Sequence, residues 1–189
     1  MKALWLLLFL IACAVIAIAA WWLASRDVAE APPGSTNLQT SIPDAAMPEN
    51  AIPDNAQPDN AQPATVNYVH DGDTLFLDTA DDSNLKTRLL AVDTPEVGDC
   101  YGAEATALLR SLAPEGSTVY TLADVEPLDQ YGRSLLFVWT SDGQLINLAL
   151  VSSGHAEAVF IGGNRLYEAE FEAAEEAAYS GSLGMWGAC

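Results

Sequence analysis

The segment RLLAVDTPE, residues 88–96, places an arginine, an apolar run and two carboxylates close together. The apolar run predicts a strand over residues 86–92, and Pro95 ends it because proline donates no backbone hydrogen bond. In a regular strand Arg88 and Asp93 are an odd number of residues apart and face opposite ways. They can share a site only if the chain leaves the pleat near Asp93, which the proline permits.

Two turn segments flank this strand in the sequence. DGDT, residues 71–74, joins predicted strands over residues 65–69 and 74–77, and alone it is compatible with a hairpin turn or a metal loop. DQYGR, residues 129–133, is a second tight turn that leads into a predicted strand over residues 134–140. Alone it is compatible with a hairpin that carries a solvated arginine.

The remaining elements complete one domain over residues 65–189. Helical spacing of apolar residues predicts helices, and a β-rich run predicts one more strand. The helices are expected over residues 101–112, 145–151 and 164–179, and the strand over residues 117–122. Because strands and helices do not alternate strictly, the pattern favours the α+β class over a doubly wound sheet.

The amino-terminal segment predicts a membrane anchor over residues 1–26. Residues 3–24 contain no charged side chain, and a helix of this length spans roughly 33 Å, enough to cross a bilayer core. Trp21 and Trp22 lie where interfacial aromatic residues are found. A cleaved signal peptide is the alternative, although its apolar region is usually shorter. Lys2 favours an orientation with the amino terminus inside and the rest outside the cytoplasm, and cleavage would release a secreted protein.

Residues 27–64 predict a disordered linker. From Ile42 the chain repeats with a period of five residues, as IPDAA, MPENA, IPDNA and QPDNA. A proline in every repeat disfavours helix, and the apolar content is too low to form a core.

Six segments together resemble the thermonuclease family, which has staphylococcal-nuclease-like domains. They are DGDT, RLLAVDTPE, CYGAEA, DQYGR, DGQLINLALVSSGHA and GSLGMWGAC, and the resemblance covers residues 65–189 in order. It implies an α+β fold with an OB-type five-stranded barrel and three helices. It also implies hydrolysis of phosphodiester bonds in DNA and RNA with Ca²⁺ as cofactor.

The resemblance also implies a role for each matching residue. Asp73 and Asp93 match the calcium-binding carboxylates of the family, and Thr94 matches the residue that offers a backbone carbonyl. All three provide the hard oxygen donors that Ca²⁺ prefers.

Three further residues match the catalytic groups of the family. Glu96 matches the carboxylate that positions or deprotonates the attacking water. Arg88 and Arg133 match the two arginines that grip the phosphate and stabilise its developing charge. Tyr131 is retained and could stack on a base. The chain departs from the family at residues 159–163, which lack the usual substrate-binding tyrosines, and at Gln130, which is often lysine.

Two cysteines lie outside the apolar segment, Cys100 and Cys189. In an exported domain they are compatible with a disulfide or with two separate thiols. The resemblance favours the disulfide, since relatives with a cysteine before the first helix often end in a similar Trp-x-x-Cys tail.

The charge conflicts with nucleic-acid binding. The chain has a formal net charge of -19, and residues 65–189 hold five basic against 20 acidic residues. A polyanion approaches such a surface slowly and binds weakly, although a bound Ca²⁺ inverts the local sign. We therefore expect a monomeric, membrane-tethered, calcium-dependent nuclease of DNA or RNA outside the cytoplasm. The alternatives are a non-catalytic OB-type module that binds nucleic acid or protein, and a structural surface protein on a stalk.

Overall fold

The computed structural model describes residues 57–189. The predicted anchor and most of the predicted linker lie outside these residues. Among the helices of residues 57–189, none has the length and apolar character needed to cross a bilayer.

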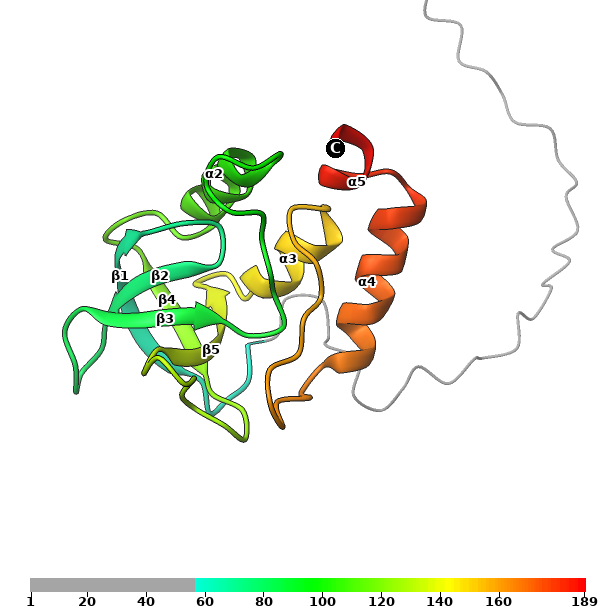
Figure 1. The fold of residues 1–189 in the computed structure, drawn as a ribbon. Helices are drawn as coiled ribbons and strands as arrows, with labels where there is room; N and C mark the ends of the chain where they lie inside the picture. The colour runs from blue at the N-terminus through cyan, green and yellow to red at the C-terminus, as the bar shows by residue number, and fades with distance from the viewer. Residues whose placement is uncertain (1–56) are drawn as a thin grey trace, which may run out of the picture. The chain divides into compact units, whose positions relative to one another are not determined.

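Five strands form a closed barrel (Figure 1). They are β1 (Gln62–Val69), β2 (Thr74–Asp78), β3 (Leu85–Leu89), β4 (Thr118–Leu122) and β5 (Ser134–Thr140). Their order around the barrel is β1-β2-β3-β5-β4. Every pair is antiparallel except β3 and β5, which run parallel. The predicted five-stranded barrel is confirmed.

The first strand begins earlier than the sequence indicated. β1 starts at Gln62, three residues before the expected domain boundary at Thr65. Residues 62–65 of β1 pair with β4, and residues 65–69 pair with β2. Pro63 is tolerated because this part of the strand has a ladder partner on one side only.

Four helices accompany the barrel in the described part of the chain. They are α2 (Gly102–Leu112), α3 (Ile146–Ser152), α4 (Glu168–Ser180) and α5 (Met185–Ala188). The first three confirm the prediction, but α4 begins at Glu168 and not at Asn164. Tyr167 has a φ of 66°, which is incompatible with a continuous helix through that residue. The single turn α5 was not predicted.

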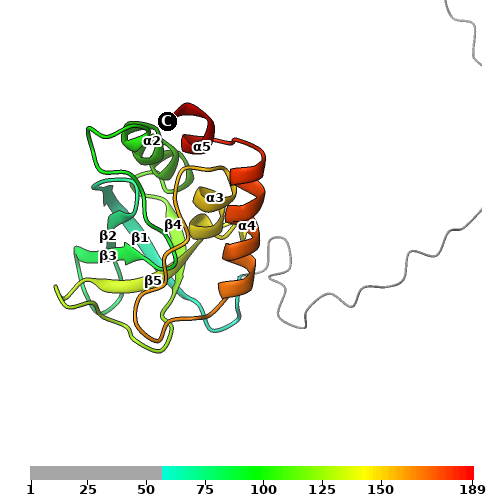
Figure 2. The ribbon, with the colours of Figure 1, turned by 45° about the vertical axis from the view of Figure 1, so that its right-hand side comes forward.

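The helices α3 and α4 cover one side of the barrel, whereas β1, β2 and β3 lie on the side away from α4 (Figures 1 and 2). Phe137 and Trp139 of β5 are fully buried on the covered side. The Phe137 ring lies 6.0 Å from that of Phe171 in α4 and 5.3 Å from that of Tyr167. This apolar contact fixes α4 against the β5 side of the barrel.

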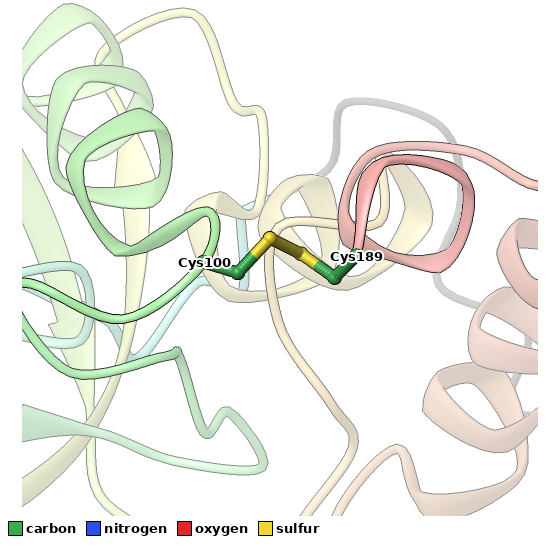
Figure 3. Close-up of a disulfide and its surroundings, with 2 residues drawn as sticks. All are labelled: Cys100 and Cys189. Carbon is green, nitrogen blue, oxygen red and sulfur yellow. A yellow bond between two sulfur atoms is a disulfide. The ribbon is translucent and has the colours of Figure 1, made fainter.

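A disulfide joins the loop before α2 to the end of the chain (Figure 3). Cys100 and Cys189 are bonded, with their Cα atoms 6.0 Å apart and a sequence separation of 89. The predicted pairing is confirmed. The bond ties the tail after α5 to the loop that carries Asp93 and Glu96, so the carboxy terminus is held against fraying.

Replacing both Cys100 and Cys189 with Ser should lower the free energy of unfolding by about 2–5 kcal/mol. The chain-entropy model assigns a large effect to a closed loop of 89 residues, because the bond restricts the unfolded chain. Urea unfolding of the full chain measures the change, and a reductant should have no further effect on the double variant. Three reactive thiols in the unfolded, unreduced full chain, in place of the single thiol of Cys13, would contradict the bond.

Candidate active site

The turn between β1 and β2 holds Asp73 in a fixed position. The Asp71 carboxylate accepts hydrogen bonds from the backbone nitrogens of Asp73, at 3.2 Å, and Thr74, at 2.8 Å. The Asp73 carboxylate in turn accepts a hydrogen bond from the Thr74 hydroxyl at 2.9 Å. A Cβ at Gly72 would lie 2.6 Å from the Thr94 hydroxyl, so only glycine lets this turn approach the loop after β3.

Arg88 lies at the centre of the site, and its side chain is 7% exposed. One guanidinium nitrogen, Nη2, contacts Asp93 Oδ1 at 2.7 Å and Asp73 Oδ2 at 3.1 Å. The other, Nη1, donates to the carbonyl oxygens of Leu89, at 2.9 Å, and Val92. A single guanidinium therefore holds two carboxylates and the backbone of the following loop.

The strand that carries Arg88 ends at Leu89, and the prediction that it continues to Val92 was wrong. The chain turns at Leu90 and Ala91, and Ala91 has a φ of 57°. The Leu89 and Val92 carbonyls converge on the Arg88 guanidinium, which compensates for the lost strand pairing. Arg88 and Asp93 share a site because the chain leaves the pleat here, earlier than Pro95.

The loop after this turn is fastened at two further points. Asn147 of α3 is fully buried and donates from its side chain to the Leu90 carbonyl at 2.9 Å. The backbones of Asp93 and Glu157 exchange two hydrogen bonds, of 3.0 and 2.8 Å. The sequence analysis assigned no role to Asn147 or to Glu157. A lone amide in the apolar run of α3 is a signal that could have identified Asn147.

The environment of Asp73 favours a positively charged neighbour. Burial raises the pKa of its carboxyl above the ordinary value; Arg88 opposes that rise and Asp71 adds to it. The side chain of Asp93 is 56% exposed, so solvent reaches the site from its side. Two carboxylates beside one guanidinium leave negative charge that a further cation would balance.

The donor set fits a hard divalent cation bound partly by water. Asp73 and Asp93 offer carboxylate oxygens, and the Thr94 backbone nitrogen lies 3.4 Å from Asp73 Oδ2, so the loop bearing the Thr94 carbonyl adjoins them. Within residues 57–189, no three acidic, histidine or cysteine side chains form a ready-made cage. A calcium ion here would need backbone and water ligands as well, which Ca²⁺ accepts.

Glu96 lies on the same loop, three residues beyond Asp93, and is exposed. Its backbone carbonyl accepts a hydrogen bond from the Asp99 nitrogen at 2.9 Å. Gly102, at the start of α2, allows this loop to pass close by, since a Cβ there would lie 2.1 Å from the Glu96 carbonyl oxygen. The residue is exposed, and no basic side chain within residues 57–189 forms an ion pair with its carboxylate.

Arg133 lies at the start of β5, next to β3 in the barrel. Its Nε contacts Asp129 Oδ2 at 2.6 Å, and its side chain is 24% exposed. Burial tends to raise the pKa of Asp129, but hydrogen bonds from Arg133 and the Tyr131 backbone lower it below its ordinary value. A persistent carboxylate at Asp129 therefore orients the guanidinium, which lies 5.7 Å from the centre of the exposed Tyr131 ring.

The barrel register relates the two arginines. Ser134, which follows Arg133, pairs with Thr87, which precedes Arg88. The parallel pairing of β3 and β5 thus brings the backbone at Arg133 close to the part of β3 that carries Arg88. The structure joins Asp73, Arg88, Asp93 and Thr94 by direct contacts, whereas Glu96, Tyr131 and Arg133 adjoin them through the loop and the register.

Comparison with known proteins identifies related chains. The model of the family described as Staphylococcal nuclease homologue matches residues 86–188. The Thermonuclease of Staphylococcus intermedius is 34% identical over 127 residues, which cover 64% of this chain and 74% of that protein. The Thermonuclease of Staphylococcus hyicus is 31% identical over 124 residues, 62% of this chain and 72% of that protein. Endonuclease YhcR of Bacillus subtilis (strain 168) is 32% identical over 134 residues, but these cover only 11% of its length.

Proposed function

The chain belongs to the family of staphylococcal nuclease homologues, and from this premise we propose that it hydrolyses phosphodiester bonds of DNA, RNA or both with calcium as cofactor. The observation that carries the proposal is the contact of Arg88 with both Asp73 and Asp93. This contact places a phosphate-binding group and two hard oxygen donors at one point of the barrel, which a pure binding module would not need.

The two arginines are assigned to the phosphate. A guanidinium binds phosphate oxygens through a planar pair of donors, and it stabilises the charge that develops as the bond breaks. Arg133 is held by one carboxylate and remains partly exposed, so it can turn toward a substrate. The buried Arg88 is held by two backbone carbonyls through Nη1 and by Asp73 and Asp93 through Nη2, so its position is set before substrate arrives, and a phosphate would take the place of one of these contacts.

Glu96 is assigned as the general base. Its exposed carboxylate can take a proton from the attacking water, and the hydrogen bonds of its loop limit how far it moves. Tyr131, exposed beside Arg133, is assigned to a base or sugar of the substrate.

Asp73, Asp93 and the Thr94 carbonyl are the residues that would hold calcium. When bound, the ion supplies positive charge that favours approach of the phosphate and lowers the pKa of a nearby water. The buried Asp73 carboxylate supports this assignment, because its charge lacks full compensation from Arg88 alone.

Activity is expected to disappear when divalent cations are removed. Chelation should lower the cleavage rate of an oligonucleotide to background, because the two carboxylates of the metal-free site repel the phosphate. Added Ca²⁺ should restore the rate. Ca²⁺ should also raise the unfolding temperature of the wild type, and raise it less in the Asp93→Asn variant, since a ligand stabilises the state it binds. An unchanged cleavage rate under chelation rules the metal assignment out.

Binding of substrate is expected to depend weakly on salt. Residues 57–189 contain five basic residues, so few counterions are released from the nucleic acid on binding. In a titration of the full chain, a plot of the logarithm of the affinity against the logarithm of the salt concentration should have a shallow negative slope. A slope as steep as that of a strongly basic nuclease would be inconsistent with the assigned contacts.

We also propose that the protein acts as a monomer outside the cytoplasm, held at a membrane by residues 3–24. The disulfide supports this location, since such bonds persist in oxidising compartments. Protease added to intact cells should digest the domain. Protection of the domain until the cells are lysed would overturn the proposed location.

A further inference from the structure

We propose that the outer surface of β1, β2 and β3 is a subsite for single-stranded nucleic acid, centred on the row Tyr68, Phe76 and Lys86. The proposal rests on the proposed function and extends it. The row would receive the part of a substrate strand that continues beyond the phosphate held by Arg88 and Arg133.

The row is built from residues in register on three neighbouring strands. Tyr68 pairs with Phe76, and Phe76 pairs with Lys86. The two rings are stacked, with centroids 4.4 Å apart and planes inclined by 11°. The Lys86 ammonium lies 5.9 Å from the Phe76 centroid, and the His70 ring meets Phe76 edge-on at 6.4 Å.

The row remains open to solvent. Tyr68 is 37% exposed, and Lys86 is exposed as well. At Tyr68, β1 has β2 on one side, while β4 pairs with residues 62–65 only. The helices α3 and α4 lie across the barrel from this side (Figures 1 and 2), while α2 reaches β1 at its Val69 end, through Arg110. A cross-strand aromatic pair stabilises a hairpin, but that role needs neither exposure nor a flanking cation.

The row continues directly into the candidate active site. Thr87, which follows Lys86, pairs with Ser134, the first residue of β5, and Arg133 directly precedes it. Arg88 follows Lys86 by two residues and therefore shares its face of β3. We call the row together with Arg88 and Arg133 the belt. From β1 to β5 the belt crosses three strand spacings, about 14 Å in all. A strand bound at the arginines can reach Tyr68 without leaving the surface.

The distribution of positive charge follows the same belt. Residues 57–189 carry five basic side chains, and three of them, Lys86, Arg88 and Arg133, lie on it. Arg110 flanks it, because its Nη2 donates to the carbonyl of Val69, next to Tyr68, at 3.4 Å. The fifth, Arg165, pairs with Glu168 at 3.0 Å, at the start of α4. Arg88 is paired with Asp73 and Asp93, and Arg133 with Asp129, so within residues 57–189 Lys86 and Arg110 are the basic side chains without an ion-pair partner, and both lie at this surface.

Exposed aromatic rings flanked by basic side chains favour single-stranded over duplex nucleic acid. Rings stack on unpaired bases whatever their sequence, and flanking cations contact the phosphates between them. The bases of a duplex are stacked on each other and present no free face to Tyr68. A basic protein segment, by contrast, would be repelled by Lys86 and Arg110.

The test is binding of a labelled oligothymidylate of about ten nucleotides, followed by fluorescence anisotropy. The full chain carries Glu96→Gln to keep the strand intact, which a gel verifies. Tyr68→Thr and Phe76→Thr should each weaken binding about tenfold, and Lys86→Gln should weaken it less. Binding of a duplex of equal length should change little, so the preference for single strands should fall.

Two controls separate stacking from stability. Tyr68→Phe keeps the ring and should keep the affinity, while Tyr179→Thr removes an exposed ring from α4 and should have no effect. The subsite would be overturned if Tyr68→Thr and Phe76→Thr both left the affinity for the single strand unchanged. It would also be overturned if they lowered the affinity for the duplex by the same factor. Cleavage of plasmid by the wild-type chain tests the proposed function separately, because the binding assay does not depend on hydrolysis.

Discussion

Replacing Glu96 with Gln is expected to lower kcat for phosphodiester hydrolysis by about 100-fold or more. The amide has the shape of the carboxylate but cannot accept the proton of the attacking water. Because the Glu96 side chain is exposed and its loop is held through the backbone, the fold should survive the change. The effect should appear in kcat more than in KM, since the proton moves only during the reaction.

Asp99→Asn is the matched control for this variant. Asp99 is an exposed residue on the same loop, and its substitution by Asn removes the same charge as Glu96→Gln does. It should retain nearly wild-type turnover, which would show that loss of charge alone is not the cause. If Glu96→Gln also retains turnover, Glu96 takes no part in the mechanism.

Arg133→Gln is expected to lower turnover by a similar factor, about 100-fold. The guanidinium is assigned to the charge that develops on the phosphate, and glutamine offers no positive charge to stabilise it. Arg133→Lys should recover only part of the rate, because an ammonium cannot form the planar pair of hydrogen bonds. Steady-state kinetics on one oligonucleotide substrate compares the three proteins.

Stability must be measured beside the rate, because Asp129 loses its partner in the Arg133→Gln variant. The Asp129 side chain is 6% exposed, so an unpaired carboxylate there costs stability. Arg165→Gln serves as the control, since it removes an arginine from an exposed ion pair at the start of α4. An Arg133→Gln variant that stays folded and fully active would exclude Arg133 from catalysis.

The local pattern of the sequence predicted most of the secondary structure. Alternating apolar residues identified the strands, and turn residues such as Asp71 and Gly72 placed their ends. These features depend on neighbours in sequence, so they can be recognised without a structure. The barrel and the disulfide between Cys100 and Cys189 came from the resemblance of whole motifs, and both are confirmed.

The missed features depend on particular side-chain contacts. The end of β3 is set by the Arg88 guanidinium, which gathers two backbone carbonyls and makes the turn at Ala91 favourable. Asn147 holds the same loop from a helix 57 residues away. A strand pattern alone anticipates neither contact, because the first is a side-chain contact with the backbone one and four residues along, and the second requires α3 to be packed on the barrel.

The aromatic row shows the same limitation. Tyr68 and Phe76 lie in separate strands, and a period of two indicates only that each faces away from the core. Their stacking and the approach of Lys86 follow from the register of the three strands. The register also pairs Thr87 with Ser134, so the segments that carry Lys86 and Arg133 adjoin, which no spacing in the sequence reveals.

The most direct test of the account is hydrolysis of plasmid DNA and of RNA by the purified full chain with Ca²⁺. We predict cleavage of at least one of them by the wild type, loss of cleavage under chelation, and a strongly reduced rate for Glu96→Gln. A folded, calcium-supplied wild-type chain that leaves both nucleic acids intact would contradict the proposed nuclease activity.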